Sequence, residues 1–151
     1  MRQVYENKGM SIFFEQLNVG DQLPALEIDV TTKLITGAAI ATRDYQDVHR
    51  DQDAARALGS PDIFMNILTS NGLVGRYVTD WCGPRSMLKK VAIRLGAPNY
   101  PGDTMRFSGE VVSLNEEESC AELKVVGANK IGEHVIAEVK VQLPATATTF
   151  C

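Results

Sequence analysis

SPDIFMNILTSNGLVGRYVTDW, residues 60–81, is the longest helical pattern in this sequence of 151 residues. Its first residues, Ser60, Pro61 and Asp62, are typical of a helix start: a capping hydroxyl, a proline at the first helical position and an acid in the first turn. Apolar side chains then recur at near-helical spacing, at Phe64, Ile67, Leu68, Val74, Tyr77, Val78 and Trp81. Because few charges interrupt the pattern, we predict a long helix from about residue 61 that is largely buried.

After the Gly83–Pro84 break the apolar period changes to two. Alternating apolar and polar residues predict four strands, over residues 90–95, 105–111, 121–126 and 135–143. Short polar turns join them, so we expect the four strands to form an antiparallel meander. One long buried helix followed by a twisted antiparallel sheet predicts an α+β protein of the hot-dog type, with the sheet wrapped around a long central helix.

Upstream of the long helix the sequence predicts one strand and two shorter helices. Residues 26–32 alternate as a strand does, and residues 33–42 form a helical segment that Thr31 or Thr32 can cap. A second short helix is expected over residues 51–58, where Asp51 opens the first turn. A polar loop over residues 43–51 therefore lies between the two short helices.

Composition and charge limit the classes of protein to consider. The chain is 44% hydrophobic and 23% charged, which is typical of a globular domain, and we expect a single domain over residues 1–151 with residues 1–10 loosely ordered. The net charge of −4 and the absence of a basic block argue against a nucleic-acid surface. No apolar run approaches the length of a membrane span, and residues 1–10 resemble neither a signal peptide nor an anchor.

The cysteines and one small basic cluster carry weaker signals. Three cysteines with no C-x-x-C spacing argue against a disulfide framework and a zinc site, so we expect a reducing, cytoplasmic setting. Lys89, Lys90 and Arg94 form a basic cluster that fits a solvated strand edge, with the phosphates of coenzyme A as the alternative contact.

The polar loop holds the residues with the clearest chemistry. Asp44 and His49 lie five residues apart in ATRDYQDVHR, residues 41–50. An aspartate can orient or accept a proton, a histidine can transfer one near neutral pH, and a helix N-terminus can hold a developing oxyanion. This combination is what adding or removing water beside a carbonyl requires. The same two residue types also meet by chance in polar loops, so the pair alone leaves a structural role open.

The other polar candidates have simpler interpretations. Asp47 and Asp51 are expected to cap or solvate the loop and the next helix, and a single histidine in this segment argues against a metal site. Asn66 is either a hydrogen-bonded core amide or a backbone N–H donor to a thioester oxygen. His134 is expected at a solvent-facing or edge position of its strand, and Tyr45 in packing. Neither a G-x-S-x-G elbow nor a nucleotide-binding glycine motif occurs in the sequence.

Taken with the capped helix and the YPGDT turn at residues 100–104, the Asp44–His49 pair resembles the MaoC-like, R-specific enoyl-CoA hydratase family. The resemblance covers about residues 14–143 and implies a hot-dog fold. It implies that Asp44 and His49 activate a water molecule that adds across the 2,3 double bond of a trans-2-enoyl-CoA. It also implies that the backbone N–H of Asn66 holds the thioester oxygen. No cofactor is implied beyond the coenzyme A of the substrate, and no substrate-binding residue is assigned.

Two departures from the family motif narrow the resemblance. Gln46–Asp47 stands where most members have Asn-Pro, and Met65–Asn66 stands where most have His-Gly. With these departures, the runs ATRDYQDVHRD, DIFMNILT, GLVGRYVTDW and RFSGEVV are similar to the small catalytic subunits of heteromeric steroid side-chain enoyl-CoA hydratases.

That similarity implies a second hot-dog subunit that lacks the Asp/His pair, and a steroid- or bile-acid-derived acyl group. The alternatives are a homodimeric R-specific hydratase of ordinary fatty enoyl-CoA and a non-catalytic hot-dog partner subunit. The presence of both Asp44 and His49 argues against the last.

Overall fold

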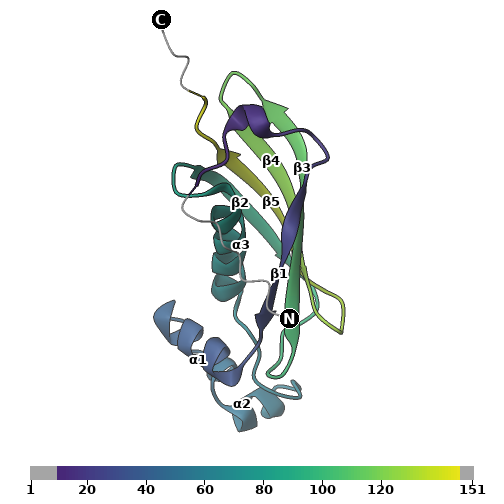
Figure 1. The fold of residues 1–151 in the computed structure, drawn as a ribbon. Coiled ribbons are helices and arrows are strands. Elements are labelled where there is room, and N and C mark those ends of the chain that lie inside the picture. The colour runs from purple at the N-terminus through teal and green to yellow at the C-terminus, as the bar shows by residue number, and fades with distance from the viewer. Residues whose placement is uncertain (1–9, 147–151) are drawn as a thin grey trace, which may run out of the picture.

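The computed structural model describes residues 10–146, and the part of the expected loose N-terminus before residue 10 lies outside them. After the first strand come the helices, and four strands then follow one another in the last part of the described chain (Figure 1). In chain order the elements are η1 (Phe14–Gln16), β1 (Gln22–Asp29), α1 (Thr32–Ala41), η2 (Asp47–His49), α2 (Gln52–Ala57), α3 (Ile67–Cys82), β2 (Met87–Leu95), β3 (Thr104–Asn115), β4 (Cys120–Ala128) and β5 (Glu133–Gln142). No helix among residues 10–146 is long and apolar enough to cross a membrane.

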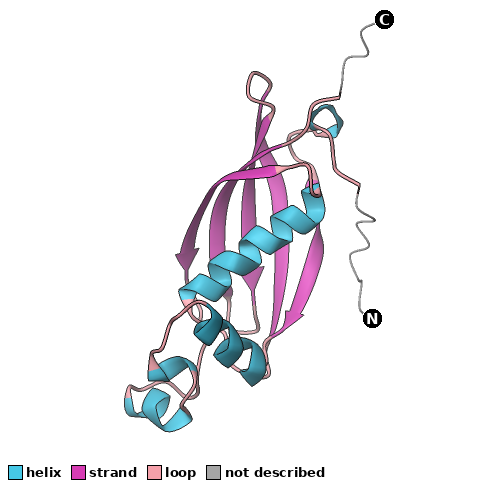
Figure 2. Ribbon diagram, turned by 90° about the vertical axis from the view of Figure 1, so that its left-hand side faces the viewer, coloured by secondary structure: helices cyan, strands magenta, loops and turns pink. Residues whose placement is uncertain are grey.

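The five strands form one antiparallel sheet in the order β1-β3-β4-β5-β2, and α3 lies across one face of it (Figure 2). This is the predicted hot-dog architecture, and all of the predicted strands are present. The expected meander is wrong for β2, which pairs with β5 and not with β3. The reason is that β1 and β4 occupy both edges of β3, so β5 offers the free edge.

The core lies between α3 and the inner face of the sheet. In β3, buried and exposed residues alternate strictly from Thr104 to Glu110, which is the pattern of a strand with one solvated face. Tyr77 of α3 stacks on Phe107 of β3, with ring centroids 5.3 Å apart and an interplanar angle of 21°. Burying this aromatic pair fixes α3 on the sheet and so fixes where its N-terminus lies.

The short helices gather beside that N-terminal end of α3 (Figures 1 and 2). Thr31 caps α1 through its side chain, which accepts from Leu34 N, and Asp51 caps α2 by accepting from Asp53 N and Ala54 N. Both short helices were predicted, and the cap of α2 confirms the expected role of Asp51. The loop that carries Asp44 and His49 is thereby held between two capped helices.

Candidate active site

Asp44 is placed by the way α1 ends. Arg43 adopts a left-handed conformation with φ of 59°, which is uncommon for a residue with a side chain, and this turns the chain sharply. The Asp44 N–H then donates to the carbonyl of Ala39, 2.9 Å away. As a result the Asp44 carboxylate leaves the end of α1 in the direction of α3.

His49 is placed by the short helix η2 and by the irregular segment before α3. Its ring is buried, and its Nδ1 lies 2.6 Å from the carbonyl oxygen of Phe64. A carbonyl can only accept, so Nδ1 carries the hydrogen and Nε2 of the neutral ring is left as an acceptor. Nε2 lies 3.3 Å from Oδ2 of Asp44. The structure therefore brings together the two residues that the sequence predicted to act together.

The environment of Asp44 favours its charged form. Asn66 Nδ2 donates to Oδ2 at 3.0 Å, and the Gln46 N–H donates to Oδ1 at 3.4 Å. The pKa of Asp44 is lowered, chiefly by the Asn66 hydrogen bond and to a smaller degree by the Gln46 N–H and by the charge that His49 carries when it is protonated, while partial burial opposes the shift. Asp44 is thus a carboxylate at neutral pH, ready to accept a proton or orient a donor.

Asn66 stands directly before α3 as its N-cap. Its side-chain oxygen accepts from the Thr69 N–H at 3.0 Å, which satisfies one of the free donors of the first turn. The predicted helix start at Ser60–Pro61 is wrong, because the helix begins at Ile67. The correction moves the Asn66 N–H from inside the helix to its N-terminus.

Tertiary contacts explain why no helix forms before residue 66. The amides of residues 63–65 are each held by a partner outside a helix: Ile63 N donates to Asp62 Oδ1 at 2.7 Å, Phe64 N to Val48 O at 3.3 Å and Met65 N to Asn99 O at 3.1 Å. The Ser60 hydroxyl donates to the carbonyl of Asp62 instead of capping a helix. This segment is docked against η2 and the β2–β3 loop, and that docking overrides its local helix signal.

The backbone N–H of Asn66 is free to bind a ligand atom. Within residues 10–146 no backbone or side-chain acceptor takes it. It stands at the positive end of the α3 dipole, on the same residue whose side chain contacts Asp44. The site therefore combines a carboxylate, an imidazole acceptor and an unused N–H donor.

Sequence reasoning missed two parts of this site. The Phe64 carbonyl that fixes the His49 ring is a backbone group and leaves no signature in a sequence. Asn66 is the buried, hydrogen-bonded amide that the sequence offered as one alternative, but its roles as N-cap and as donor to Asp44 were missed. Asparagine is a preferred N-cap residue ahead of an apolar run, and the stronger motif at Ser60–Pro61–Asp62 concealed this signal.

Two other expectations concern an aspartate and a tyrosine near the site. Asp47 forms an exposed ion pair with Arg50 at 2.6 Å, as expected of a loop-solvating residue. Tyr45 is 61% exposed, so its predicted packing role is wrong: the turn at Arg43 directs it outward while Asp44 points inward. Among residues 10–146 no group of three or more His, Cys, Asp or Glu side chains could hold a metal ion.

The prediction that His134 is solvent-facing is also wrong. Its ring is buried at 2% exposure, with Nδ1 donating to Ala97 O at 2.6 Å and Nε2 2.7 Å from the Ser70 hydroxyl. Its strand faces the core at this position, and the two hydrogen bonds satisfy the ring there. Burial lowers the pKa of His134, so the ring is neutral and joins β5 to α3 as a structural group.

This buried histidine makes stability depend on pH. A lowered pKa means that the unfolded chain binds a proton, with a pKa of about 6.5, before the folded chain does, so stability is full above that pH and falls below it. We expect the free energy of unfolding to drop between pH 7 and 5.5, by at most about 1.4 kcal/mol per pH unit for one group. In His134→Gln this slope should be smaller, although the variant is less stable at every pH. Equal slopes in urea titrations would contradict the assignment.

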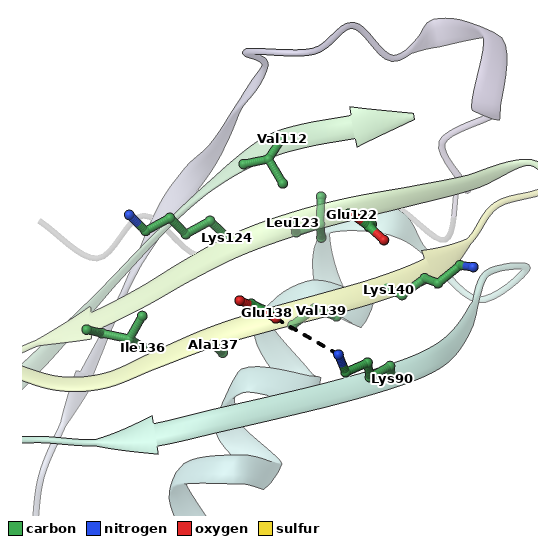
Figure 3. Close-up of a pocket in the computed structure, with 10 residues that line it drawn as sticks. All are labelled: Lys90, Val112, Glu122, Leu123, Lys124, Ile136, Ala137, Glu138, Val139 and Lys140. Carbon is green, nitrogen blue, oxygen red and sulfur yellow. Dashed lines mark ion pairs between the residues drawn. The ribbon is translucent and has the colours of Figure 1, made fainter. Parts of the chain in front are cut away.

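One pronounced hollow in the described residues lies away from this site. It has a volume of about 460 Å³ and sits on the outer face of the sheet, opposite α3 (Figure 3). Its rim carries charges of both signs, including Lys90 and Glu138, whose charged atoms are 3.9 Å apart. Mixed charge of this kind is typical of the solvated face of an antiparallel sheet, and we assign it no chemistry.

Comparison with known proteins agrees with this fold. No protein-family model matches the chain. Over 125 residues the chain is 50% identical to the 3-oxo-4,17-pregnadiene-20-carboxyl-CoA hydratase beta subunit of Mycobacterium tuberculosis, an alignment that covers 83% of this chain and 95% of that protein.

Solved structures of two similar proteins have the same fold. A chain in the crystal structure of the ChsH1–ChsH2 complex from Mycobacterium tuberculosis is 50% identical and superposes with a TM-score of 0.81, covering 83% of this chain and 98% of that one. A MaoC-like dehydratase from Rhodospirillum rubrum shares the fold at 20% identity, with a TM-score of 0.75 and coverage of 90% of this chain and 99% of that one.

Fold and relatives together define a hydro-lyase of the hot-dog class, a hydratase. More narrowly, the chain belongs to the MaoC-like enoyl-CoA hydratase family. The family resemblance read from the sequence is thereby confirmed.

Proposed function

We propose that this chain is the catalytic subunit of a heteromeric hydratase that adds water across the 2,3 double bond of a bulky, steroid- or bile-acid-derived trans-2-enoyl-CoA. One observation carries the proposal: Nε2 of His49 and Oδ2 of Asp44 are proton acceptors 3.3 Å apart, beside a free N–H at a helix N-terminus. The name of the 50% identical relative, a pregnadiene-carboxyl-CoA hydratase subunit, supports the polycyclic acyl group.

The proposed reaction uses Asp44 and His49 as a unit. A water molecule held against both acceptors loses a proton to the pair as its oxygen bonds to C3 of the enoyl thioester. A proton then returns from the pair to C2, so the two hydrogens and the oxygen of water are all accounted for. The Phe64 carbonyl keeps the His49 ring in the tautomer that can accept this proton.

The negative charge that develops on the thioester oxygen needs a donor. We assign this role to the Asn66 N–H, which has no acceptor within residues 10–146 and adds the α3 dipole to its own polarity. The structure departs here from the glycine that most family members have, because Asn66 supplies a side chain as well.

A second hot-dog subunit is part of the proposal. The apolar side chains Ile40, Tyr45, Ile67 and Leu68, which flank the Asp44–Asn66 contact in sequence, are between 47% and 61% exposed. The 50% identical chain was crystallised as the ChsH1–ChsH2 complex. A partner that covers these side chains would complete an acyl pocket. We also propose a cytoplasmic location, as expected from the cysteines. Cys82 and Cys120 are free and buried, which fits a reducing compartment.

The test compares the chain alone with the chain co-expressed with its hot-dog partner. Loss of the conjugated enoyl-thioester absorbance is followed with a polycyclic and with a short linear enoyl-CoA. We expect activity only when both subunits are present, and only on the polycyclic substrate. Activity of the isolated chain on linear substrates would instead favour the homodimeric hydratase of fatty enoyl-CoA. A mixture that stays active after Asp44→Asn would favour a non-catalytic role for this chain.

A further inference from the structure

We propose that the Asn66 side chain is a positioning residue that ties the water-activating Asp44 to the start of α3. This inference rests on the proposed function, since it assigns Asp44 to the reaction. It goes beyond the oxyanion role of the Asn66 backbone, because it concerns the side-chain amide.

The two ends of this amide are fixed in opposite directions. Its oxygen accepts from both the N–H and the hydroxyl of Thr69, in the first turn of α3. Its nitrogen therefore points the other way, where it donates to Asp44 Oδ2 at 3.0 Å and to Thr42 Oγ1 at 3.1 Å. Thr42 Oγ1 donates onward to Ala38 O at 2.8 Å, so it is available as an acceptor for Asn66. Each polar group of a side chain that is 2% exposed is thus satisfied.

Helix capping alone does not require this arrangement. An N-cap needs only a side-chain oxygen, and aspartate or serine would supply one equally well. The nitrogen end is what an asparagine adds, and both of its hydrogens are used at the end of α1. The residue type at position 66 is therefore specified by Asp44 and Thr42, and not by the helix.

The consequence is a fixed spacing between the two halves of the proposed site. The backbone N–H of Asn66 is to hold the thioester oxygen, and its side chain holds the carboxylate that orients water. One residue thus sets both positions, which a glycine could not do. The amide donor also stabilises the charged form of Asp44: in the described residues His49 is the titratable side chain paired with Asp44, and Asn66 at the start of α3 is a neutral donor to it.

The experiment uses two variants of the assembled enzyme that keep the cap. Asn66→Ser retains an oxygen for Thr69 but loses the donor to Asp44. Asn66→Asp has nearly the same shape and places a second carboxylate where the donor was. We expect kcat to fall about tenfold in Asn66→Ser and about a hundredfold or more in Asn66→Asp, with KM little changed. The acidic limb of the pH profile should move upward in both, and by more than about one unit in Asn66→Asp.

A matched control and a second measurement separate the possible outcomes. Asp51→Asn exchanges the same two residue types at the N-cap of α2, and we expect it to leave the pH profile unchanged. The Asp44 carboxyl carbon is also titrated by NMR in aspartate-labelled enzyme, with its resonance identified through Asp44→Asn. An upward move of this titration in Asn66→Ser supports the inference even if no hydration is found and the proposed function fails. An unmoved titration and pH profile in Asn66→Ser would overturn it, whatever the activity.

Discussion

Asp44→Asn and His49→Ala should each lower hydration by the assembled enzyme by about 10²- to 10⁴-fold, the contribution of a positioned acid/base group. Asp44→Asn keeps the shape of the side chain and its contact with Asn66 but removes the charge that orients water. His49→Ala removes the Nε2 acceptor, and it leaves the Phe64 carbonyl without its donor. The rate is measured as the initial loss of enoyl-thioester absorbance with the partner subunit present.

The neighbouring aspartate supplies the control for this prediction. Asp47→Asn removes a carboxylate from the same loop, but that side chain is exposed and pairs with Arg50. We expect close to full activity in Asp47→Asn and an unchanged circular dichroism spectrum in all three variants. Near-normal turnover in Asp44→Asn or His49→Ala would remove that residue from the proposed mechanism.

The parts of the fold that the sequence predicted are those in which local pattern and tertiary packing agree. The strict alternation in β3 has one solution, because a shift by one residue would bury Arg106 and expose Phe107. The start of α3 is the opposite case. Ser60–Pro61–Asp62 is a strong local start signal, yet the amides of Phe64 and Met65 donate to Val48 of η2 and to Asn99 of the β2–β3 loop. Those partners lie far away in the sequence, so no local rule could include them.

The predicted pairing of β2 was wrong for a related reason. Alternation identifies a strand but not its neighbour, and sequence order favours adjacent pairing. The position of β2 is decided by β1, which occupies the edge of β3 with the register Gln22↔Glu110 to Asp29↔Thr104. This strand order becomes clear only when the first and last strands are considered together.

The sequence predicted the two central residues of the candidate site, but not the hydrogen bonds that orient them. Asp44 and His49 were found because their chemistry is recognisable, whereas the contacts that orient them come from a backbone carbonyl and an asparagine amide. The departure at Gln46–Asp47 also has a local explanation. Asp47 begins η2, a position that suits proline but also accepts an acidic residue at the start of a helix.

Phe107→Ala should be strongly destabilising, with a loss of about 3–5 kcal/mol in the free energy of unfolding. The ring is fully buried, stacks on Tyr77 and lies opposite Gly127 in the β3–β4 register. A Cβ on Gly127 would come within 2.9 Å of Phe107 Cε1. The ring therefore fills the space that this glycine leaves, and no neighbouring side chain on β4 can replace it when it is removed.

Urea unfolding of Phe107→Ala, compared with Val112→Ala on the same strand, measures this effect. Val112 is 43% exposed on the outer face, so its truncation should cost within about 0.5 kcal/mol. Because Phe107 holds Tyr77, and Tyr77 lies on α3, loss of the ring should also loosen the helix whose N-terminus carries Asn66. Turnover of the folded fraction should then fall, although Phe107 contacts no catalytic group. A loss near that of Val112→Ala would mean that this end of the sheet repacks freely, and that α3 is held by contacts other than the Tyr77–Phe107 stack.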